Sequence, residues 1–340
     1  MTPIMLSISR HFLTHLGMTL LMCGALAHTA QAQKNPGLPG NYPSKPVRIL
    51  IGTAPGGSTD FLSRTILGRV GEKWGATFVM ENIASVAGGA IPLEAALKQP
   101  ADGYTILTAS GSTYQNATYS QKVSYDVRKV FTGAAQFTIS PLVMGVNATL
   151  PVNNVKELIA YAKSKPAGEL NLATSGIGSS SHLAGELLNL LAGIEMTSVP
   201  YKGVAPSVTD TIAGRTQITF GTSVALLPHV RSGKLKLLGI TSPTRMSSLP
   251  DVPTIAEMGV PGYAYVGWIG AVVKTGTPPA IISALNQDAI QVIKSPEVQK
   301  ALSADGSEPA YSSLEQFRET IDGALERAGK LIKERGLVLN

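Results

Sequence analysis

Two loops rich in glycine, serine and threonine hold the residues of this sequence that are best suited to bind a ligand. Each loop follows an apolar run typical of a buried strand and precedes a run with helical periodicity. Glycine allows close approach of the backbone, and the first turn of a helix carries unpaired N–H groups with about +0.5 of dipole charge. Because neither loop contains Lys or Arg, these N–H groups and the hydroxyls would hold an anion. The candidate residues are Ala54, Gly56, Gly57, Ser58, Thr59 and Asp60 in the first loop, and Ser175, Gly176, Gly178, Ser179 and Ser180 in the second.

Two other interpretations of these loops compete with an anion site. A serine, threonine or aspartate in either loop could simply cap its helix. The second loop also matches part of a dinucleotide fingerprint at Gly176 and Gly178, but Ser181 stands where the third glycine belongs. Because two such loops occur, one in each expected domain, the anion site is the favoured interpretation.

Residues 1–32 have the pattern of a cleaved export signal. Arg10 precedes the apolar run LGMTLLMCGALA, and the segment ends in small residues at Ala30 and Ala32. The run is shorter than the roughly 20 residues of a membrane-spanning helix, so a membrane anchor is the weaker alternative. We expect a periplasmic mature chain that begins with a short tether, residues 33–41.

Removal of this leader would leave few groups for catalysis or metal binding. The single cysteine, Cys23, would be lost, and only His182 and His229 would remain of the five histidines. A Cys/His metal cluster is then excluded. No G-x-S-x-G elbow is present, and a Ser–His–Asp triad would have to recruit one of the two histidines. We therefore expect neither an enzyme nor a metal site, and no cofactor.

The segments around the loops alternate between strand and helix patterns, which predicts α/β layers. Helices are expected after the first loop, from Asn154, after the second loop and over residues 315–335; the first has Leu62, Ile66 and Val70 on one face. Strands are expected at PVRILIG (46–52), FVMEN (78–82), GYTILTAS (103–110), LNLAT (170–174), TSVPY (197–201), QITFGT (217–222) and LKLLGIT (235–241).

Composition narrows the class of protein further. A chain of 340 residues with 44% hydrophobic residues is long enough for two domains with their own cores. Aromatic residues make up only 6%, and the net charge of +6 is spread along the chain without a Lys/Arg cluster. A nucleic-acid-binding protein, a disordered chain and a coiled coil are therefore poor fits.

The sequence resembles the Bug receptors, the extracytoplasmic solute-binding proteins of tripartite tricarboxylate transporters. The resemblance runs from Tyr42 to the final helix. Its segments are YPSKPVRILI followed by APGGSTD, then ADGYTILTAS, LNLATSGIGSSSHLAGELL, VPYKGVAPSVTD, GKLKLLGITSPTR, LPDVPTIAEMGVPGY and PPAIISALN.

The resemblance implies the fold of a type II periplasmic binding protein, in which two α/β lobes joined by crossing strands enclose a ligand cleft. It also implies a discontinuous first lobe, made of residues 42–141 and 263–340. The second lobe, residues 142–262, would lie between these two parts of the chain.

The resemblance further implies that amides, hydroxyls and waters of the two loops hold a ligand carboxylate. Ser110, Tyr201 and Thr222 are additional candidates at strand ends facing the same cleft, although Tyr201 could equally belong to a packed turn. Many family members have Phe-Asp-Asn where this chain has Phe220, Gly221 and Thr222. The missing aspartate favours a carboxylate without an amino group.

The expected function is that of a monomeric periplasmic receptor that delivers a small di- or tricarboxylate, or an aromatic acid, to a membrane transporter. A different class of function is also open, in which the chain reports its ligand to a membrane sensor kinase. No feature of the sequence separates transport from sensing.

Overall fold

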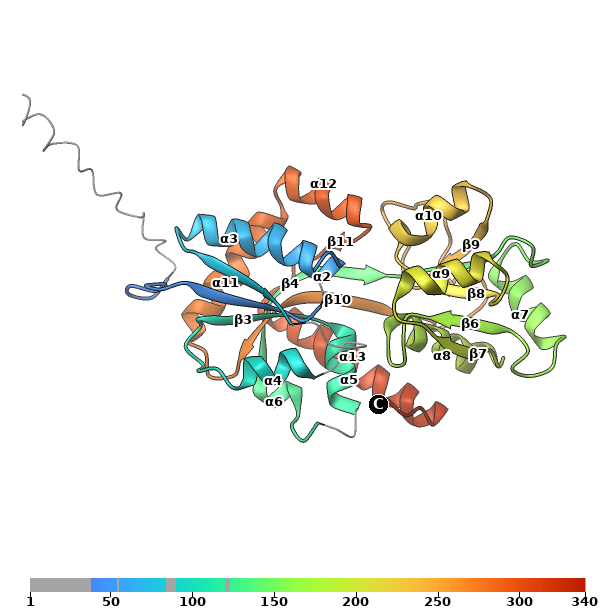
Figure 1. Cartoon of the computed structure of the whole chain (residues 1–340), viewed down its shortest axis with the longest axis horizontal. Helices are drawn as coiled ribbons and strands as arrows, with labels where there is room; N and C mark the ends of the chain where they lie inside the picture. Colours follow the sequence, from blue (N-terminus) through green and yellow to red (C-terminus); the bar gives the residue numbers. More distant parts are fainter. Residues whose placement is uncertain (1–37, 54, 84–89, 120–122, 340) are drawn as a thin grey trace, which may run out of the picture. The chain divides into compact units, whose positions relative to one another are not determined.

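The computed structural model describes residues 38–53, 55–83, 90–119 and 123–339. The expected leader, most of the tether and Ala54 therefore lie outside the described residues. Residues 35–340 form one compact unit, which contains two separate β-sheets (Figure 1).

The first sheet has six strands in the order β11-β4-β10-β3-β1-β2. Strand β1 pairs in parallel with β2 and β3, whereas β10 pairs antiparallel with β3 and β4. The strands are β1 (Val47–Ile51), β2 (Phe78–Asn82), β3 (Thr105–Ser110), β4 (Phe131–Pro141), β10 (Val266–Lys274) and β11 (Glu308–Pro309).

The second sheet has five strands in the order β7-β6-β8-β5-β9. Strand β6 is parallel to β7 and β8, and β5 is antiparallel to β8 and β9. The strands are β5 (Val143–Asn147), β6 (Asn171–Thr174), β7 (Thr197–Pro200), β8 (Ile218–Gly221) and β9 (Leu235–Ile240).

Helices cover both sheets, each of which has its own buried apolar clusters. Around the first sheet the helices are α2 (Ser58–Leu62), the π-helix η1 (Ser63–Leu67), α3 (Gly68–Lys73), α4 (Ile91–Leu97), α5 (Gly111–Tyr119), α6 (Val127–Val130), α11 (Pro279–Ile293), α12 (Pro296–Asp305) and α13 (Leu314–Arg335). Around the second they are α7 (Val155–Lys163), α8 (Ser180–Ala192), α9 (Val204–Ile212) and α10 (Ser223–Arg231).

The chain passes between the sheets at two places. Strand β4 of the first sheet continues through Leu142 into β5 of the second. The chain returns after β9 and enters the first sheet again as β10. Each strand and helix expected from the sequence is present, so the predicted α/β layers and crossing strands are confirmed. The sequence analysis did not identify β4, β5, β10 and β11 as strands.

Local sequence signals explain where several helices begin. The Asn154 side chain accepts a hydrogen bond from the Glu157 N–H and caps α7. Ser313 and Gln316 form a capping box that begins α13 one residue before the predicted start. One face of α13 is buried, since Phe317 and Leu325 are almost fully covered.

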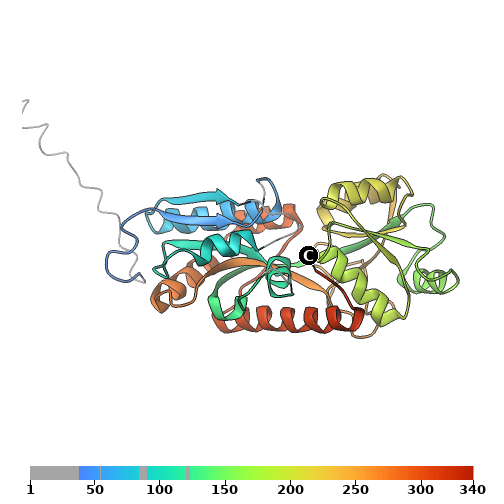
Figure 2. The same ribbon diagram turned by 60° about the horizontal axis from the view of Figure 1, so that its bottom comes forward.

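Helix α13 also links the two parts of the molecule. In Figure 2 it runs, in red, along the first sheet, and its C-terminal half packs against α8 through Leu183, Ala328 and Leu331. The Arg335 Nε donates to Glu186 Oε2 of α8 at 3.0 Å. Over the described parts of the chain, no helix is both long and apolar enough to cross a bilayer.

Candidate functional site

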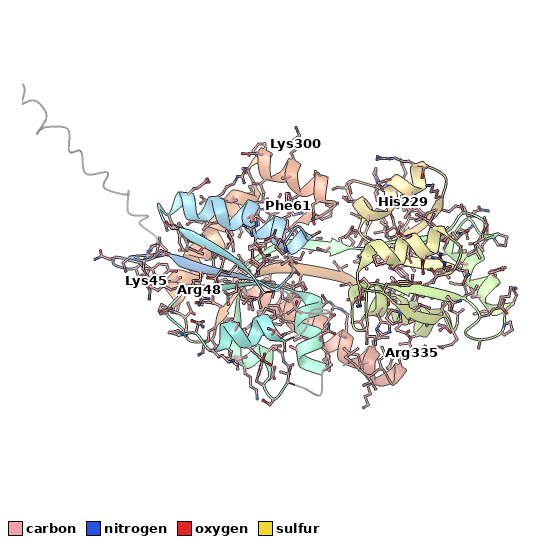
Figure 3. All side chains as sticks on the ribbon, in the orientation of Figure 1. Lys45, Arg48, Phe61, His229, Lys300 and Arg335 are labelled. Atoms are coloured by element: carbon pink, nitrogen blue, oxygen red, sulfur yellow. The ribbon has the colours of Figure 1, made fainter. Side chains whose placement is uncertain are left out.

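A cavity of about 220 Å³ lies between the two sheets. Its wall is rich in hydroxyl groups from both sides, and it includes no Lys, Arg, His, Asp or Glu among the described residues. Labelled basic residues such as Lys45 and Lys300 are instead exposed at the outside of the molecule (Figure 3). The hydroxyl residues of the wall are Ser58, Ser110, Ser112, Ser140, Ser175, Ser179, Ser180, Ser181, Thr222 and Ser307.

Five helices begin at this cavity. Its wall includes the first residues of α2, α5, α8 and α9, which are Ser58, Gly111, Ser180 and Val204, and the N-cap of α10, Thr222. Helix N-termini carry unpaired N–H groups and partial positive charge. Their convergence gives the cavity a positive potential without any basic side chain, which suits a small anion.

The second glycine loop is held by side chains of its own helix. The Gly178 N–H donates to His182 Nδ1 at 3.1 Å, and the Ser175 N–H donates to Ser181 Oγ at 2.8 Å. Ser179 is the N-cap of α8 and accepts from the His182 N–H. The amides of Gly178 and Ser175 are therefore occupied, which leaves the hydroxyls and the helix N-terminus to face a ligand.

The first glycine loop is held by Asp60. Its carboxylate accepts from the Gly56 N–H at 3.0 Å, from Arg64 Nε at 2.8 Å and from Asn82 Nδ2 at 2.9 Å. Burial of the carboxyl acts to raise its pKa, but these hydrogen bonds outweigh it and hold the pKa of Asp60 below its usual value. Asp60 positions the loop, and of this loop Ser58 lines the cavity.

Trp268 of β10 is a wall residue that the sequence analysis missed. It is 2% exposed, and its indole Nε1 has no hydrogen-bond partner among the described residues. Its ring is fixed by edge contacts with Tyr114 and Phe317, each at 5.2 Å between ring centroids. A Cβ on Gly111 would lie 3.2 Å from Nε1, so glycine lets the ring approach the start of α5. Its glycine neighbours in VGWIG were the signal for a close backbone approach.

The structure brings together six of the predicted site residues: Ser58, Ser110, Ser175, Ser179, Ser180 and Thr222 all line the cavity. Gly56, Gly57, Thr59, Asp60, Gly176 and Gly178 belong to the supporting parts of the two loops and are not in its wall. Tyr201 is also outside the wall, and its hydroxyl donates to Asp210 Oδ2 at 2.8 Å. Ser112, Ser140, Ser181 and Ser307 line the cavity but were missed.

No cluster of metal-ligating side chains accompanies this cavity. Within the described ranges, no group of three or more His, Cys, Asp or Glu side chains is placed to hold a metal ion. The wall offers N–H donors and hydroxyls, which are groups that bind and orient a solute.

Two β-sheets covered by helices and joined by crossing strands, with a polar cavity between them, define a type II periplasmic binding protein. A family model described as "Tripartite tricarboxylate transporter family receptor" matches residues 62–337. The chain belongs to this family of solute-binding receptors, which confirms the resemblance to the Bug proteins.

Individual relatives agree with this assignment. Protein BugT of Bordetella pertussis is 33% identical over 300 residues, which cover 88% of this chain and 91% of BugT. The structure of Rpa4515 of R. palustris with adipate has 33% identity and a TM-score of 0.77, covering 88% of this chain and 99% of that one. The structure of MatC of Rhodopseudomonas palustris with bound malate has 26% identity and a TM-score of 0.73, covering 86% and 100%.

Proposed function

We propose that this receptor captures a small carboxylate in the cavity between its two sheets and delivers it to a membrane transporter. The observation that carries the proposal is the Trp268 indole N–H. Trp268 belongs to the cavity wall, and this buried donor has no hydrogen-bond partner among the described residues. An unmade hydrogen bond of a buried donor costs about 1–3 kcal/mol. A ligand acceptor beside Gly111 relieves this cost, and the five helix N-termini favour an acceptor with negative charge.

The chemistry of the wall favours a carboxylate held by neutral groups. A hydrogen bond to a charged group contributes about 1.5–3 kcal/mol, so three or four such bonds supply the roughly 8 kcal/mol of micromolar binding. The cavity of about 220 Å³ is smaller than the about 300–1,000 Å³ of drug-sized sites. The relatives solved with adipate and with malate indicate an aliphatic di- or tricarboxylate, and an aromatic acid is the alternative.

The proposed ligand-binding residues are those predicted from the two loops together with the wall residues found in the structure. Ser58, Ser110, Ser175, Ser179, Ser180, Thr222 and Trp268 form the direct set, and Gly56, Gly57, Thr59, Asp60, Gly176 and Gly178 support it. Tyr201 belongs to a packed turn in this proposal, because its hydroxyl is engaged by Asp210.

We assign the first lobe to residues 42–141 and 263–340, and the second lobe to residues 142–262. Contacts near the cavity connect these two parts of the chain: the Ser247 hydroxyl donates to Glu308 Oε1 at 2.9 Å, and Gly306 lies against Ser223. Closure of the lobes over the ligand would present a composite surface to the membrane partner. The chain acts as a monomer in the periplasm after cleavage following Ala32.

The experiment is a thermal-shift screen of the mature chain against carboxylates, each paired with its neutral amide. A ligand at 100 times its Kd adds about 2.7 kcal/mol, which raises the melting temperature by several degrees. We expect succinate, malate, adipate, citrate or benzoate to stabilise the protein while the paired amide does not. Equal shifts with acids and amides, or no shift with any acid, would overturn the proposal.

The identity of the membrane partner distinguishes a role in transport from a role in sensing. We expect the liganded receptor to co-purify with transporter subunits from detergent-solubilised membranes. Co-purification with a membrane kinase alone would favour the sensing alternative. Mass spectrometry of periplasmic protein tests the export step, since a chain that retains residues 1–32 contradicts it.

A further inference from the structure

One corner of the cavity has the opposite electrostatic character from the rest. Helix α12 ends there at Asp305, and Gly306 and Ser307 line the cavity immediately afterwards. The C-terminal end of a helix carries partial negative charge. The five helix N-termini therefore favour acceptor groups on a ligand, whereas the corner at Gly306 and Ser307 favours a donor group.

The Asp305 carboxylate sets the direction of two hydroxyl groups in the wall. Ser58 Oγ donates to Asp305 Oδ1 at 3.0 Å, and Ser307 Oγ donates to Asp305 Oδ2 at 2.6 Å. A serine hydroxyl has one proton to donate and two lone pairs that accept. Since both protons are directed to Asp305, the two oxygens face the cavity as acceptors.

Asp305 is kept in this role by its surroundings. It is partly buried, and burial raises the pKa of its carboxyl while the bonds from Ser307 and Ser58 oppose that rise. None of the salt bridges found in the described residues includes Asp305. Its negative charge is therefore balanced by these hydroxyl donors and not by a basic side chain.

We propose that the cavity selects a carboxylate that also carries a hydroxyl group, and that this hydroxyl donates to Ser58 and Ser307. This inference rests on the proposed function and specifies its ligand class. The carboxylate lies toward Trp268 and the N-termini of α5 and α8, away from Asp305, because like charges repel. Asp305 acts as a positioning residue, because the two serines line the cavity and Asp305 does not.

A hydroxyl fits this corner better than an ammonium group. An ammonium has three protons to donate and gains most from direct contact with a carboxylate. Here two serine hydroxyls stand between the cavity and Asp305, so a ligand reaches two neutral acceptor oxygens. Two neutral acceptors match the single proton of a hydroxyl, which can be shared between them.

The test is calorimetric titration of the mature protein with ligands that differ at one atom. The pairs are succinate with malate and glutarate with 2-hydroxyglutarate, and aspartate supplies the ammonium arm. We expect the hydroxylated member of at least one pair to bind about tenfold or more tightly than its parent and than the amino acid. A tenfold change equals about 1.4 kcal/mol, which is within the range of one hydrogen bond.

Two variants test whether the preference for a hydroxylated ligand arises from Asp305 and the two serines. In Asp305→Asn the amide donates to one serine and redirects its proton, so the preference should fall to about threefold or less. The parent acid should bind at least as tightly as it does to the wild type, because a negative charge near the cavity is removed. Ser58→Ala removes one acceptor and should act in the same direction. Asp251→Asn, at an exposed aspartate outside the cavity wall, is the matched control.

The outcomes distinguish this inference from the proposed function. Wild-type protein that binds carboxylates without preferring the hydroxylated member overturns the inference and leaves the proposed function standing. An undiminished preference in both Asp305→Asn and Ser58→Ala overturns the assignment to Asp305 and the two serines. A preference for aspartate makes the donor an ammonium and also overturns the inference. Absence of binding by every carboxylate overturns the proposed function itself.

Discussion

The backbone N–H of Gly178 donates a hydrogen bond of 3.1 Å to Nδ1 of His182, one turn into helix α8. Because Nδ1 accepts this bond, the imidazole is neutral with its proton on Nε2, 3.8 Å from Glu186 Oε1. His182 is 8% exposed, and burial lowers the pKa of its imidazole although the Glu186 charge opposes this. The geometry of the second glycine loop therefore depends on an uncharged histidine.

This bond predicts a loss of stability in acid. A folded-state pKa below the unfolded value means that the unfolded chain takes up the proton first as the pH falls. The stabilising contribution is present above the unfolded value of about 6.5 and is lost as the pH falls through the folded pKa. We expect the melting temperature and the ligand affinity of the wild type to fall as the pH is lowered below about 6.5.

The variant His182→Asn tests this prediction. The asparagine oxygen can still accept a hydrogen bond from the Gly178 N–H, but asparagine does not titrate. The loss of stability and affinity in acid should therefore be smaller than in the wild type. His229→Asn, on α10, is the control and should behave like the wild type. Melting curves and titrations with one ligand at several pH values check this, and parallel profiles for wild type and His182→Asn would contradict it.

Replacing Trp268 by Phe removes a donor but keeps an aromatic ring between Tyr114 and Phe317. Since the indole N–H has no partner among the described residues, its loss leaves none of them with an unsatisfied polar group. We expect ligand affinity to fall about tenfold, with a change of about 1 kcal/mol or less in the free energy of unfolding. Calorimetric titration and denaturant unfolding measure the two quantities.

Trp74→Phe is the control, because it should lower stability without changing ligand affinity. The Trp74 Nε1 donates to Asp288 Oδ2 at 2.6 Å inside the core of the first sheet, and Trp74 is outside the cavity wall. This variant should lower stability by about 1–3 kcal/mol, because it removes a buried donor from a carboxylate, and should leave affinity unchanged. Equal affinity losses in the two tryptophan variants would contradict a specific role for Trp268.

Gly306→Ala tests the close approach of α12 to α10. A Cβ at this position would lie 2.3 Å from Ser223 Oγ and 3.0 Å from Val224 Cγ2. Gly336→Ala is the matched control, since Gly336 also ends a helix with positive φ, but no atom of the described residues lies within 4 Å of the added Cβ. Both variants should lose about 1 kcal/mol from backbone strain. Only Gly306→Ala should also weaken ligand binding, and unfolding curves with titrations of both variants check this.

Ser179→Asp places a negative charge in the proposed anion site. Ser179 is the N-cap of α8, and aspartate is a good residue for that position, so the fold should remain intact. Ligand binding should be lost, because the new charge repels the ligand carboxylate. Asn154→Asp, the same kind of change at the cap of α7, should melt and bind normally. Unchanged affinity in folded Ser179→Asp protein would mean that this loop only caps its helix.

Local sequence patterns predicted the two loops and many of the elements beside them, although strands β4, β5, β10 and β11 were not identified. The periodicity that buries Leu62, Ile66 and Val70, and the cap at Asn154, are short-range signals that act within one or two turns. Glycine and hydroxyl residues between strand and helix likewise identified Ser58 and Ser179 before the fold was known.

The tertiary structure alone decided which residues meet around the cavity. Ser58 and Asp305 are 247 positions apart, and no local pattern relates them. The glycines of VGWIG indicate a close backbone approach at Trp268, but only packing against Tyr114 and Gly111 left its N–H without a partner among the described residues. Local propensity depends on neighbours along the chain, whereas the polarity of the site depends on the packing of two sheets whose strands come from distant segments.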